Sequence, residues 1–191
     1  MTHPDPIPNS VRDDLSQLGL TLAESHLARL AKYLDLMLEV NQQFNLTAIR
    51  DRDQAWRRHI VDSLTLLPHL SDTTEGAMVI DVGTGAGLPG IPLAIARPEL
   101  RVTLLEATGK KARFLQRCVN ELPLPNARVV NDRAETTGQS GAHRQKYDLA
   151  VCRAVGPLGE LLEYTLPLLK VGGTLLAMKG PKVEEELDAA G

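Results

Sequence analysis

Four closely spaced glycines give the clearest sign of a ligand-binding site in this sequence. The run VIDVGTGAGLPG (79–90) leads a hydrophobic strand directly into a turn and then into an expected helix. Its glycines are Gly83, Gly85, Gly87 and Gly90. Glycine allows a sharp turn and a close approach of a ligand to the backbone, and free N–H groups at the next helix favour an anionic group. The run therefore predicts a cofactor-binding turn, although its GxGxxG spacing alone does not identify the cofactor.

Of two acids near this turn, one fits either class of cofactor and the other discriminates between them. Glu106 ends the second expected strand, where an acid accepts hydrogen bonds from the ribose hydroxyls of either a dinucleotide or S-adenosylmethionine. Asp81 lies two residues before the first glycine, and its carboxylate would repel a pyrophosphate but attract the cationic amino and sulfonium groups of S-adenosylmethionine. We therefore favour a methyltransferase over a dinucleotide enzyme. The alternative is that Asp81 only forms hydrogen bonds within the turn.

The elements that must position these residues alternate along the second part of the chain. Short β-rich runs begin at Met78 and are separated by helix candidates. The runs are MVIDV (78–82), RVTLLEA (101–107), ARVVN (127–131), YDLAVCRA (147–154) and GTLLAMKG (173–180). This alternation predicts an α/β, Rossmann-like parallel sheet with helices on both faces. In such sheets ligands bind beyond the carboxyl ends of the strands.

An all-helical segment is expected before the sheet. Ser10 and Thr21 resemble helix caps and predict two helix starts. The second helix carries an apolar stripe that we interpret as core, formed by Leu27, Leu30, Leu34 and Leu38. The stretch SDTTEGA (71–77) has the composition of a linker. We therefore predict a helical cap over residues 1–75 and a cofactor-binding domain over residues 76–191, together forming one compact unit.

Composition excludes several classes of protein. Aromatic residues make up only 3% of the 191 residues, so the core must consist mainly of aliphatic side chains. The formal net charge is −3, so attraction to nucleic acid requires local basic patches. Neither Cys118 nor Cys152 belongs to a CxxC pair, and the histidines lack metal-ligand spacing. With no apolar run near ~20 residues and no signal peptide, we expect a cytoplasmic monomer without a metal or a membrane partner.

Six stretches of the chain, taken together, resemble a known family. They are NLTAIRD (45–51), RHIVDSL (58–64), VIDVGTGAGLPGIPLAI (79–95), LLEATGKKARFLQ (104–116), YDLAVCRAV (147–155) and GGTLLAMKG (172–180). In this order they resemble the ribosomal RNA small-subunit methyltransferase G family, also called glucose-inhibited division protein B. The resemblance implies a class I methyltransferase that uses S-adenosylmethionine to methylate N7 of one guanosine in 16S ribosomal RNA, free or in the small ribosomal subunit.

The resemblance also implies cofactor positions beyond the glycine turn and the two acids. It adds Leu88, Ala134, Glu135 and Arg153 and supports Gly83. Glu135 would accept the adenine amino group, or it is simply an acid favoured by the dipole at a helix N-terminus. The complete predicted cofactor site is Asp81, Gly83, Gly85, Gly87, Leu88, Glu106, Ala134, Glu135 and Arg153.

The resemblance bears on the end of the chain as well. Family members usually continue past the fifth strand with two more antiparallel strands, whereas this sequence ends at Gly191. We therefore expect the C-terminal strands to be missing, which would leave one edge of the sheet uncovered.

Methylation at guanine N7 requires few catalytic groups. N7 has an exposed lone pair, so the reaction needs neither a general base nor a metal, and Arg153 is the one candidate for a catalytic role. Its guanidinium would meet the cofactor carboxylate, an RNA phosphate or a base edge, or else form a structural ion pair with Asp148 or another acid. His59 and Asp62 share one face of an expected helix, where they border the cofactor pocket or dock the helical cap on the sheet.

Basic residues are the candidates for contact with RNA. Lys110 and Lys111 begin the second crossover helix, and Lys179 and Lys182 lie near the end of the fifth strand. With His59, the residues Lys110, Lys111 and Lys179 form the predicted substrate site. A run of charges is also what a solvated helix face requires, so both interpretations stay open.

Three other functions remain as alternatives. An NAD(P)-dependent oxidoreductase would share the glycine turn, but Asp81 opposes it and no hydride-transfer constellation is evident. A non-catalytic ribosome assembly factor would keep the fold and lose the glycines or the strand-end acid, which are present here. A methyltransferase with a small-molecule acceptor would share the whole cofactor site.

Overall fold

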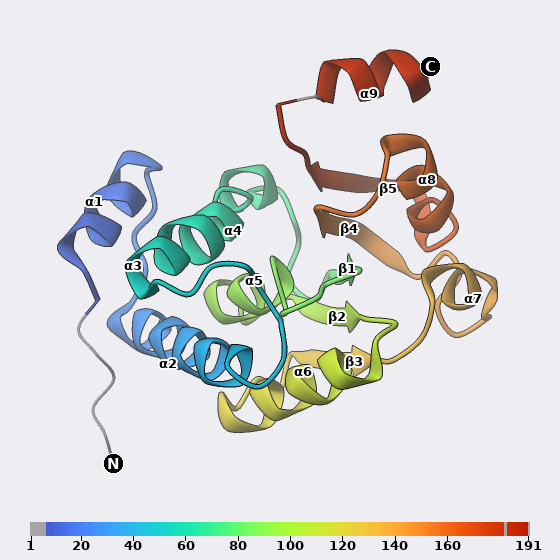
Figure 1. Ribbon diagram of the computed structural model, residues 1–191. Helices are drawn as coiled ribbons and strands as arrows, with labels where there is room; N and C mark the ends of the chain where they lie inside the picture. Colours follow the sequence, from blue (N-terminus) through green and yellow to red (C-terminus); the bar gives the residue numbers. More distant parts are fainter. Residues whose placement is uncertain (1–6, 182, 191) are drawn as a thin grey trace.

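A parallel sheet of five strands lies between two layers of helices in the computed structural model (Figure 1). The structure describes residues 7–181 and 183–190, so Lys182 lies outside the described residues. The helices are α1 (Asn9–Gln17), α2 (Glu24–Asn41), α3 (Arg52–Ala55), the π-helix η1 (Trp56–Val61), α4 (Asp62–Leu64), the 3₁₀ helix η2 (Leu67–Leu70), α5 (Gly90–Ala96), α6 (Gly109–Glu121), α7 (Ala134–Gln139), α8 (Leu158–Thr165) and α9 (Val183–Ala190). The strands are β1 (Met78–Val82), β2 (Arg101–Leu105), β3 (Ala127–Val130), β4 (Tyr147–Arg153) and β5 (Leu169–Met178).

The strand order is β3-β2-β1-β4-β5, and every neighbouring pair is parallel. Val82 pairs with Leu105, and Leu105 with Val130, so the last residues of β1, β2 and β3 lie side by side. The order reverses between β1 and β4, and parallel sheets of this kind bind ligands at such a point, outside the carboxyl ends of the strands. The predicted Rossmann-like α/β fold is confirmed.

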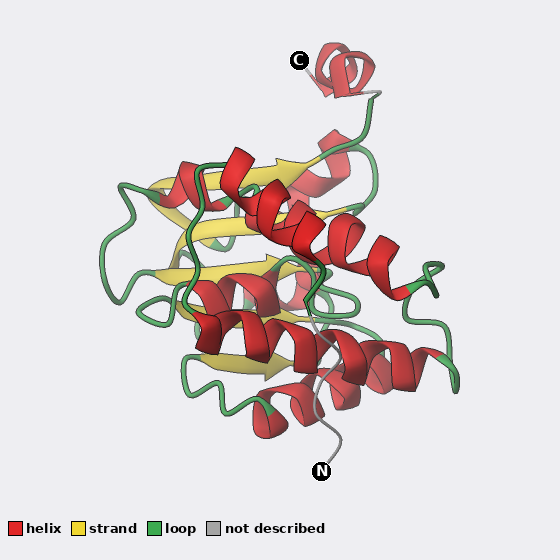
Figure 2. Cartoon of the chain, turned by 90° about the vertical axis from the view of Figure 1, so that its left-hand side faces the viewer, coloured by secondary structure: helices red, strands yellow, loops and turns green. Residues whose placement is uncertain are grey.

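Alternate side chains of the strands supply a hydrophobic cluster on each face of the sheet. Val79 and Val102 pack with residues of α2, α5 and α6, whereas Ile80 and Leu105 pack on the other face with Ala134 at the start of α7. Figure 2 shows the N-terminal helices in front of the strands. This alternation follows from the two-residue repeat of a strand, which sends successive side chains to opposite faces.

The helical segment before the sheet shares the core of the sheet. Leu30 and Leu34 of α2 are fully buried and belong to the same cluster as Val79 of β1. The apolar stripe predicted for this helix is therefore core. None of the helices within residues 7–181 and 183–190 combines the length and the apolar character needed to cross a bilayer.

Two helices begin elsewhere than their apparent capping signals predict. The first starts at Asn9 rather than Ser10, and α2 starts at Glu24 rather than Thr21. Neither helix has a side-chain cap. The Glu24 carboxylate instead forms a hydrogen-bonded ion pair with Arg12, 2.6 Å away, which joins the two helices. A tertiary contact has replaced the expected capping box.

The fifth strand also begins earlier than predicted, at Leu169 rather than residue 173. Tyr147 pairs with Leu169 and Leu149 with Thr174, so two steps along β4 correspond to five along β5. Gly172 has a φ of 84° within this irregular stretch. The glycine pair that looked like a boundary is an irregularity inside the strand.

Candidate functional site

The parallel strands bring the predicted cofactor residues to one edge of the sheet. Gly83 follows β1, Glu106 follows β2, Ala134 and Glu135 open the helix after β3, and Arg153 ends β4. Because adjacent parallel strands end at the same edge, residues up to 70 positions apart in sequence become neighbours along it. The spacing of these residues in the sequence does not show this proximity, but the strand order does.

The glycines of the turn differ in what they allow. Gly85 has a φ of 61°, and a Cβ built on it would meet nothing closer than the Gly83 carbonyl oxygen at 3.9 Å. A Cβ on Gly90 would collide with Leu104 and lie 2.7 Å from the Oδ2 atom of Asp81. Gly85 therefore leaves open space in which a ligand can approach the backbone, whereas Gly90 is required by close packing.

Asp81 forms hydrogen bonds with two residues of the glycine turn. Its Oδ2 atom accepts hydrogen bonds from Thr84 Oγ1 at 2.5 Å and from the Gly90 N–H at 2.7 Å. The side chain is fully buried, and burial raises the pKa of its carboxyl to about 7. The Oδ1 atom has no hydrogen-bond partner in the part of the chain that the structure describes. The alternative role inside the turn is therefore real, and any attraction of Asp81 for a cation would act at a distance, because its carboxyl has no exposed surface.

Glu106 ties the second strand to the turn. Its Oε2 atom accepts from the Gly85 N–H at 2.9 Å, and its Oε1 atom accepts from the Thr108 N–H at 2.8 Å. Each carboxylate oxygen can accept more than one hydrogen bond, so capacity remains for ribose hydroxyls. The acid predicted to bind ribose thus also orients the glycine turn.

Arg153 is held by the helical segment rather than by Asp148. Its Nη1 atom donates to Asp62 Oδ2 at 2.9 Å and to the Arg58 carbonyl oxygen at 3.0 Å. Asp148 pairs instead with Lys170 at 2.6 Å. Among the partners left open by the sequence, the acid is therefore Asp62, which docks the helical segment on the end of β4.

His59 links this arginine to the loop before the third helix. Its Nε2 atom lies 2.7 Å from Thr47 Oγ1, and its Nδ1 atom lies 3.3 Å from Arg153 Nη2. Nδ1 is also 3.1 Å from the Arg58 carbonyl oxygen, so only one of these two contacts is a hydrogen bond in a given tautomer. Burial, together with the nearby Arg153 cation, lowers the pKa of the imidazole. Both effects disfavour the charged form of His59, which lies in a hydrogen-bonded network with Thr47, Arg58 and Arg153.

Two predicted cofactor residues have contrasting surroundings. The Leu88 side chain is buried and packs in the hydrophobic core, so only its backbone faces the turn. Glu135 is exposed in the first turn of α7, a position that suits both an acid at a helix N-terminus and a side chain that contacts a ligand. Neither contact with a cofactor is tested by the geometry, and both stay predictions.

The basic candidates for RNA contact differ in whether their side chains already have an ion-pair partner. Lys179 Nζ lies 2.6 Å from Glu186 Oε2 and donates to the Gly156 carbonyl oxygen at 2.6 Å, and its side chain is only 9% exposed. Lys110 is exposed and Lys111 half-buried at the start of α6, and neither has an ion-pair partner among the described residues. The two lysines of α6 are therefore better placed to meet a phosphate.

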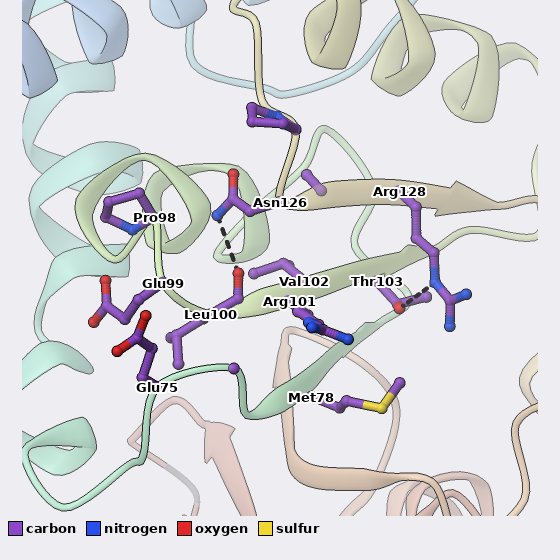
Figure 3. A pocket seen from close by; sticks show the side chains of 13 residues that line it. Glu75, Met78, Pro98, Glu99, Leu100, Arg101, Val102, Thr103, Asn126 and Arg128 are labelled. Carbon is purple, nitrogen blue, oxygen red and sulfur yellow. Dashed lines mark hydrogen bonds between the residues drawn. The ribbon is translucent and has the colours of Figure 1, made fainter.

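Two cavities lie at opposite ends of the sheet. One of about 570 Å³ is lined by Met78, Arg101, Thr103 and Arg128 at the amino ends of β1 to β3, where Arg128 donates to Thr103 (Figure 3). Another of about 400 Å³ lies at the carboxyl edge. Its lining residues include Asp62, Arg153, Met178 and Lys179. Only the second adjoins the cofactor edge, so the cavity in Figure 3 is not part of the predicted site.

Three residues complete this arrangement, of which Tyr33 and Thr47 were not singled out by the sequence and Arg58 was considered only as a basic side chain that could contact RNA. Tyr33 donates from α2 to the Ala86 carbonyl oxygen in the glycine turn, Thr47 holds His59, and Arg58 contributes its carbonyl oxygen to Arg153. The stretches NLTAIRD and RHIVDSL contain Thr47 and Arg58, so the family resemblance was the available signal for these two. No local pattern marks Tyr33.

Comparison with known proteins identifies close relatives. The family described as rRNA small subunit methyltransferase G (GidB) matches residues 26–191. Two proteins named ribosomal RNA small subunit methyltransferase G are similar over most of this chain. The one from Leuconostoc citreum is 46% identical over 174 residues, covering 91% of this chain and 73% of its own. The one from Chloroflexus aggregans is 48% identical over 172 residues, covering 90% and 71%.

Solved structures share the fold at lower identity. A SAM-dependent methyltransferase from Aquifex aeolicus is 21% identical with a TM-score of 0.52, covering 68% of this chain and 79% of that one. A predicted O-methyltransferase from Agrobacterium tumefaciens is 20% identical with a TM-score of 0.57, covering 66% and 65%. These likenesses support a class I methyltransferase fold.

Proposed function

Because the chain belongs to the rRNA small subunit methyltransferase G family, we propose that it transfers a methyl group from S-adenosylmethionine to N7 of a guanosine in 16S ribosomal RNA. The match to the family over residues 26–191 is the single observation that carries this proposal. The family supports small-subunit ribosomal RNA as the acceptor and S-adenosylmethionine as the methyl donor. The choice of N7 and of one guanosine rests on the family resemblance and on the chemistry described below.

The glycine turn fits this methyl donor. The open space beside Gly85 suits a ligand that lies against the backbone. Glu106 retains acceptor capacity for ribose hydroxyls. The bound donor supplies an electrophilic methyl group on a positively charged sulfur.

The residues of this chain have to orient the acceptor rather than activate it. Guanine N7 has a lone pair, so no side chain has to remove a proton. Holding the base in line with the methyl group can contribute about 7–11 kcal/mol. In this proposal the base enters the cavity lined by Asp62, Arg153 and Met178, at the ends of β4 and β5. Asp62 compensates the charge of Arg153, so that the guanidinium can meet a phosphate or a base edge without adding net positive charge beside the reaction.

The partners follow from the same arrangement. Lys110 and Lys111 meet phosphates of the ribosomal RNA, since the protein's net charge of −3 provides no global attraction. The protein acts as a monomer in the cytoplasm, where small ribosomal subunits are found.

A calorimetric titration tests the cofactor first. S-adenosylhomocysteine should bind the purified chain and NAD should not. Small subunits lacking the modification should then accept one labelled methyl group, recovered as 7-methylguanosine after digestion of the RNA. Binding of NAD alone would contradict the proposal. Binding of S-adenosylhomocysteine and of subunits without methyl transfer would instead favour an assembly factor.

A further inference from the structure

The glycine turn is contacted by a tyrosine from the helical segment. The Tyr33 hydroxyl donates a hydrogen bond of 2.7 Å to the Ala86 carbonyl oxygen, across 53 residues of sequence. Tyr33 lies within α2 and is fully buried, and Ala86 is 5% exposed. We propose that Tyr33 is a positioning residue that fixes the shape of the cofactor-binding turn and thereby sets cofactor affinity. The link to affinity rests on the proposed function.

The turn needs an external restraint at this point. Ala86 stands between Gly85 and Gly87, whose φ values are 61° and 99°, and glycine is the residue with the greatest backbone freedom. The Gly87 N–H and the Leu88 N–H both donate to the Thr84 carbonyl oxygen, at 2.9 and 3.0 Å. These bonds hold N–H groups of the turn, whereas the Ala86 carbonyl is held by Tyr33. Its orientation therefore depends on a side chain from outside the turn.

The Tyr33 hydroxyl is suited to donate this hydrogen bond at all times. Burial raises the pKa of its hydroxyl well above the ordinary value, so the group keeps its proton throughout the working pH range. A buried carbonyl that loses its donor cannot easily recruit water, so without the Tyr33 hydroxyl the Ala86 carbonyl either moves or remains unsatisfied.

The helix α2 contacts α6 through residues before and after Tyr33 in the sequence. Lys32 Nζ donates to the Glu121 carbonyl oxygen at 2.7 Å, at the end of α6. Arg117 of the same helix pairs with Glu39 at 3.1 Å. These contacts add to the burial of Tyr33, Leu30 and Leu34, which pack α2 into the core, so the hydroxyl is presented to Ala86 from a packed helix. The helical segment therefore contacts the glycine turn directly through Tyr33.

Loss of the Tyr33 hydroxyl should lower the fraction of molecules in which the glycine turn has the conformation that binds S-adenosylhomocysteine. Apparent affinity falls in proportion to that fraction. For Tyr33→Phe we expect the Kd for S-adenosylhomocysteine to rise about tenfold, equivalent to about 1.4 kcal/mol.

The chain provides a matched control. Tyr147 is also fully buried, and its hydroxyl lies 2.6 Å from His143 Nδ1, at the amino end of β4. Tyr147→Phe should lower the melting temperature as Tyr33→Phe does, but it should change the Kd less than threefold. Equal changes in Kd for the two variants, or no change for Tyr33→Phe, would overturn the proposal.

Amide hydrogen exchange on the ligand-free chain separates this inference from the proposed function. The Gly87 and Leu88 amides should exchange faster in Tyr33→Phe than in wild type, and at the wild-type rate in Tyr147→Phe. If wild type fails to bind S-adenosylhomocysteine, the proposed function fails, and the exchange rates still decide whether Tyr33 holds the turn. Unchanged exchange in Tyr33→Phe would overturn its positioning role.

Discussion

Arg153 and Asp62 are 91 residues apart in sequence and form an ion pair of 2.9 Å that joins the end of β4 to the helical segment. The arginine side chain is 19% exposed and the aspartate 45%, so the pair is partly shielded from solvent at the rim of the carboxyl-edge cavity. Because Arg153 can only donate, Asp62 and the Arg58 carbonyl oxygen determine where its guanidinium points. The position of Arg153 therefore depends on residues from outside its own strand.

Replacing Asp62 by Asn should impair methyl transfer more than cofactor binding. The guanidinium loses its charged partner, so we expect kcat to fall about tenfold or more, while the Kd for S-adenosylhomocysteine changes less than threefold. Stability should fall by about 1 kcal/mol or less, as for other partly exposed pairs. Steady-state kinetics and calorimetry measure the two effects.

Asp35→Asn is the control for that variant. Asp35 pairs with Arg52 at 3.0 Å with side-chain exposures of 41% and 20%, close to those of the Asp62 pair, but it joins α2 to α3 and does not involve the end of β4. It should leave kcat unchanged. If both variants lose activity in proportion to their loss of stability, the Asp62 pair is only structural.

Gly85→Val should abolish cofactor binding in a folded protein. The branched side chain would fill the open space over the turn, and we expect the Kd for S-adenosylhomocysteine to rise about a hundredfold or more. Backbone strain at a φ of 61° adds a stability loss of about 1–2 kcal/mol. Gly76→Val has comparable strain, with a φ of 78° and nothing within 4 Å, but it precedes β1 at the opposite edge. A folded Gly85→Val protein with wild-type affinity would show that the ligand lies elsewhere.

Asp81 should make stability depend on pH in an unusual direction. The pKa of its carboxyl is about 7 in the folded protein because of burial, against 3.8 as the ordinary value. Between these values the folded state holds the proton more tightly than the unfolded state, so the contribution of Asp81 to stability falls as pH rises from about 4 to about 7 and is constant above. The upper limit of this loss is about 4 kcal/mol.

Asp81→Asn isolates that effect. The amide oxygen can still accept from Thr84 and Gly90, and the variant has no charge to bury. Melting temperatures should therefore favour the variant over wild type more strongly at pH 8 than at pH 5. An identical difference at both pH values would mean that the buried carboxyl does not titrate in this range.

Substitution of Lys110 and Lys111 by Gln should weaken RNA binding without affecting the cofactor. Each lost phosphate contact should lower the slope of log K against log salt by about 0.7 for single-stranded RNA. Fluorescence anisotropy with a labelled RNA at several salt concentrations measures this slope. The double substitution of Lys146 and Lys170, near the amino ends of β4 and β5, has the same change in charge and should leave the slope unchanged.

Much of the fold could be predicted from local patterns. Each of the first four strands starts where its hydrophobic run starts, because a buried strand in a parallel sheet needs such a run. The fifth was misplaced because Gly172 and Gly173 look the same in a turn and in an irregular strand. The helix starts were misplaced because neither apparent capping signal forms a side-chain cap, and Glu24 instead pairs with Arg12, a contact that no local pattern reveals.

The site was predictable where it follows one strand and not where distant segments meet. The glycine turn and Glu106 follow directly from their strands, and both lie at the carboxyl edge. The bond between Tyr33 and Ala86 depends on how a helix packs, which composition and periodicity do not determine. Asp81 was proposed to discriminate by charge, yet its Oδ2 atom forms bonds within the turn and its carboxyl is fully buried, so the structural argument for the cofactor now rests on the open space at Gly85 and on Glu106.

The hydrophobic cluster that joins Leu30 of α2 to Val79 of β1 limits how this protein can be recombined. A chimera that takes its helical segment from one relative and its sheet from another must also match the packed side chains between them. We expect such hybrids to melt early and to bind the cofactor poorly even when every residue of the glycine turn is retained. The helical segment and the sheet should therefore be inherited together, and substitutions on one should be tolerated only alongside compensating changes on the other.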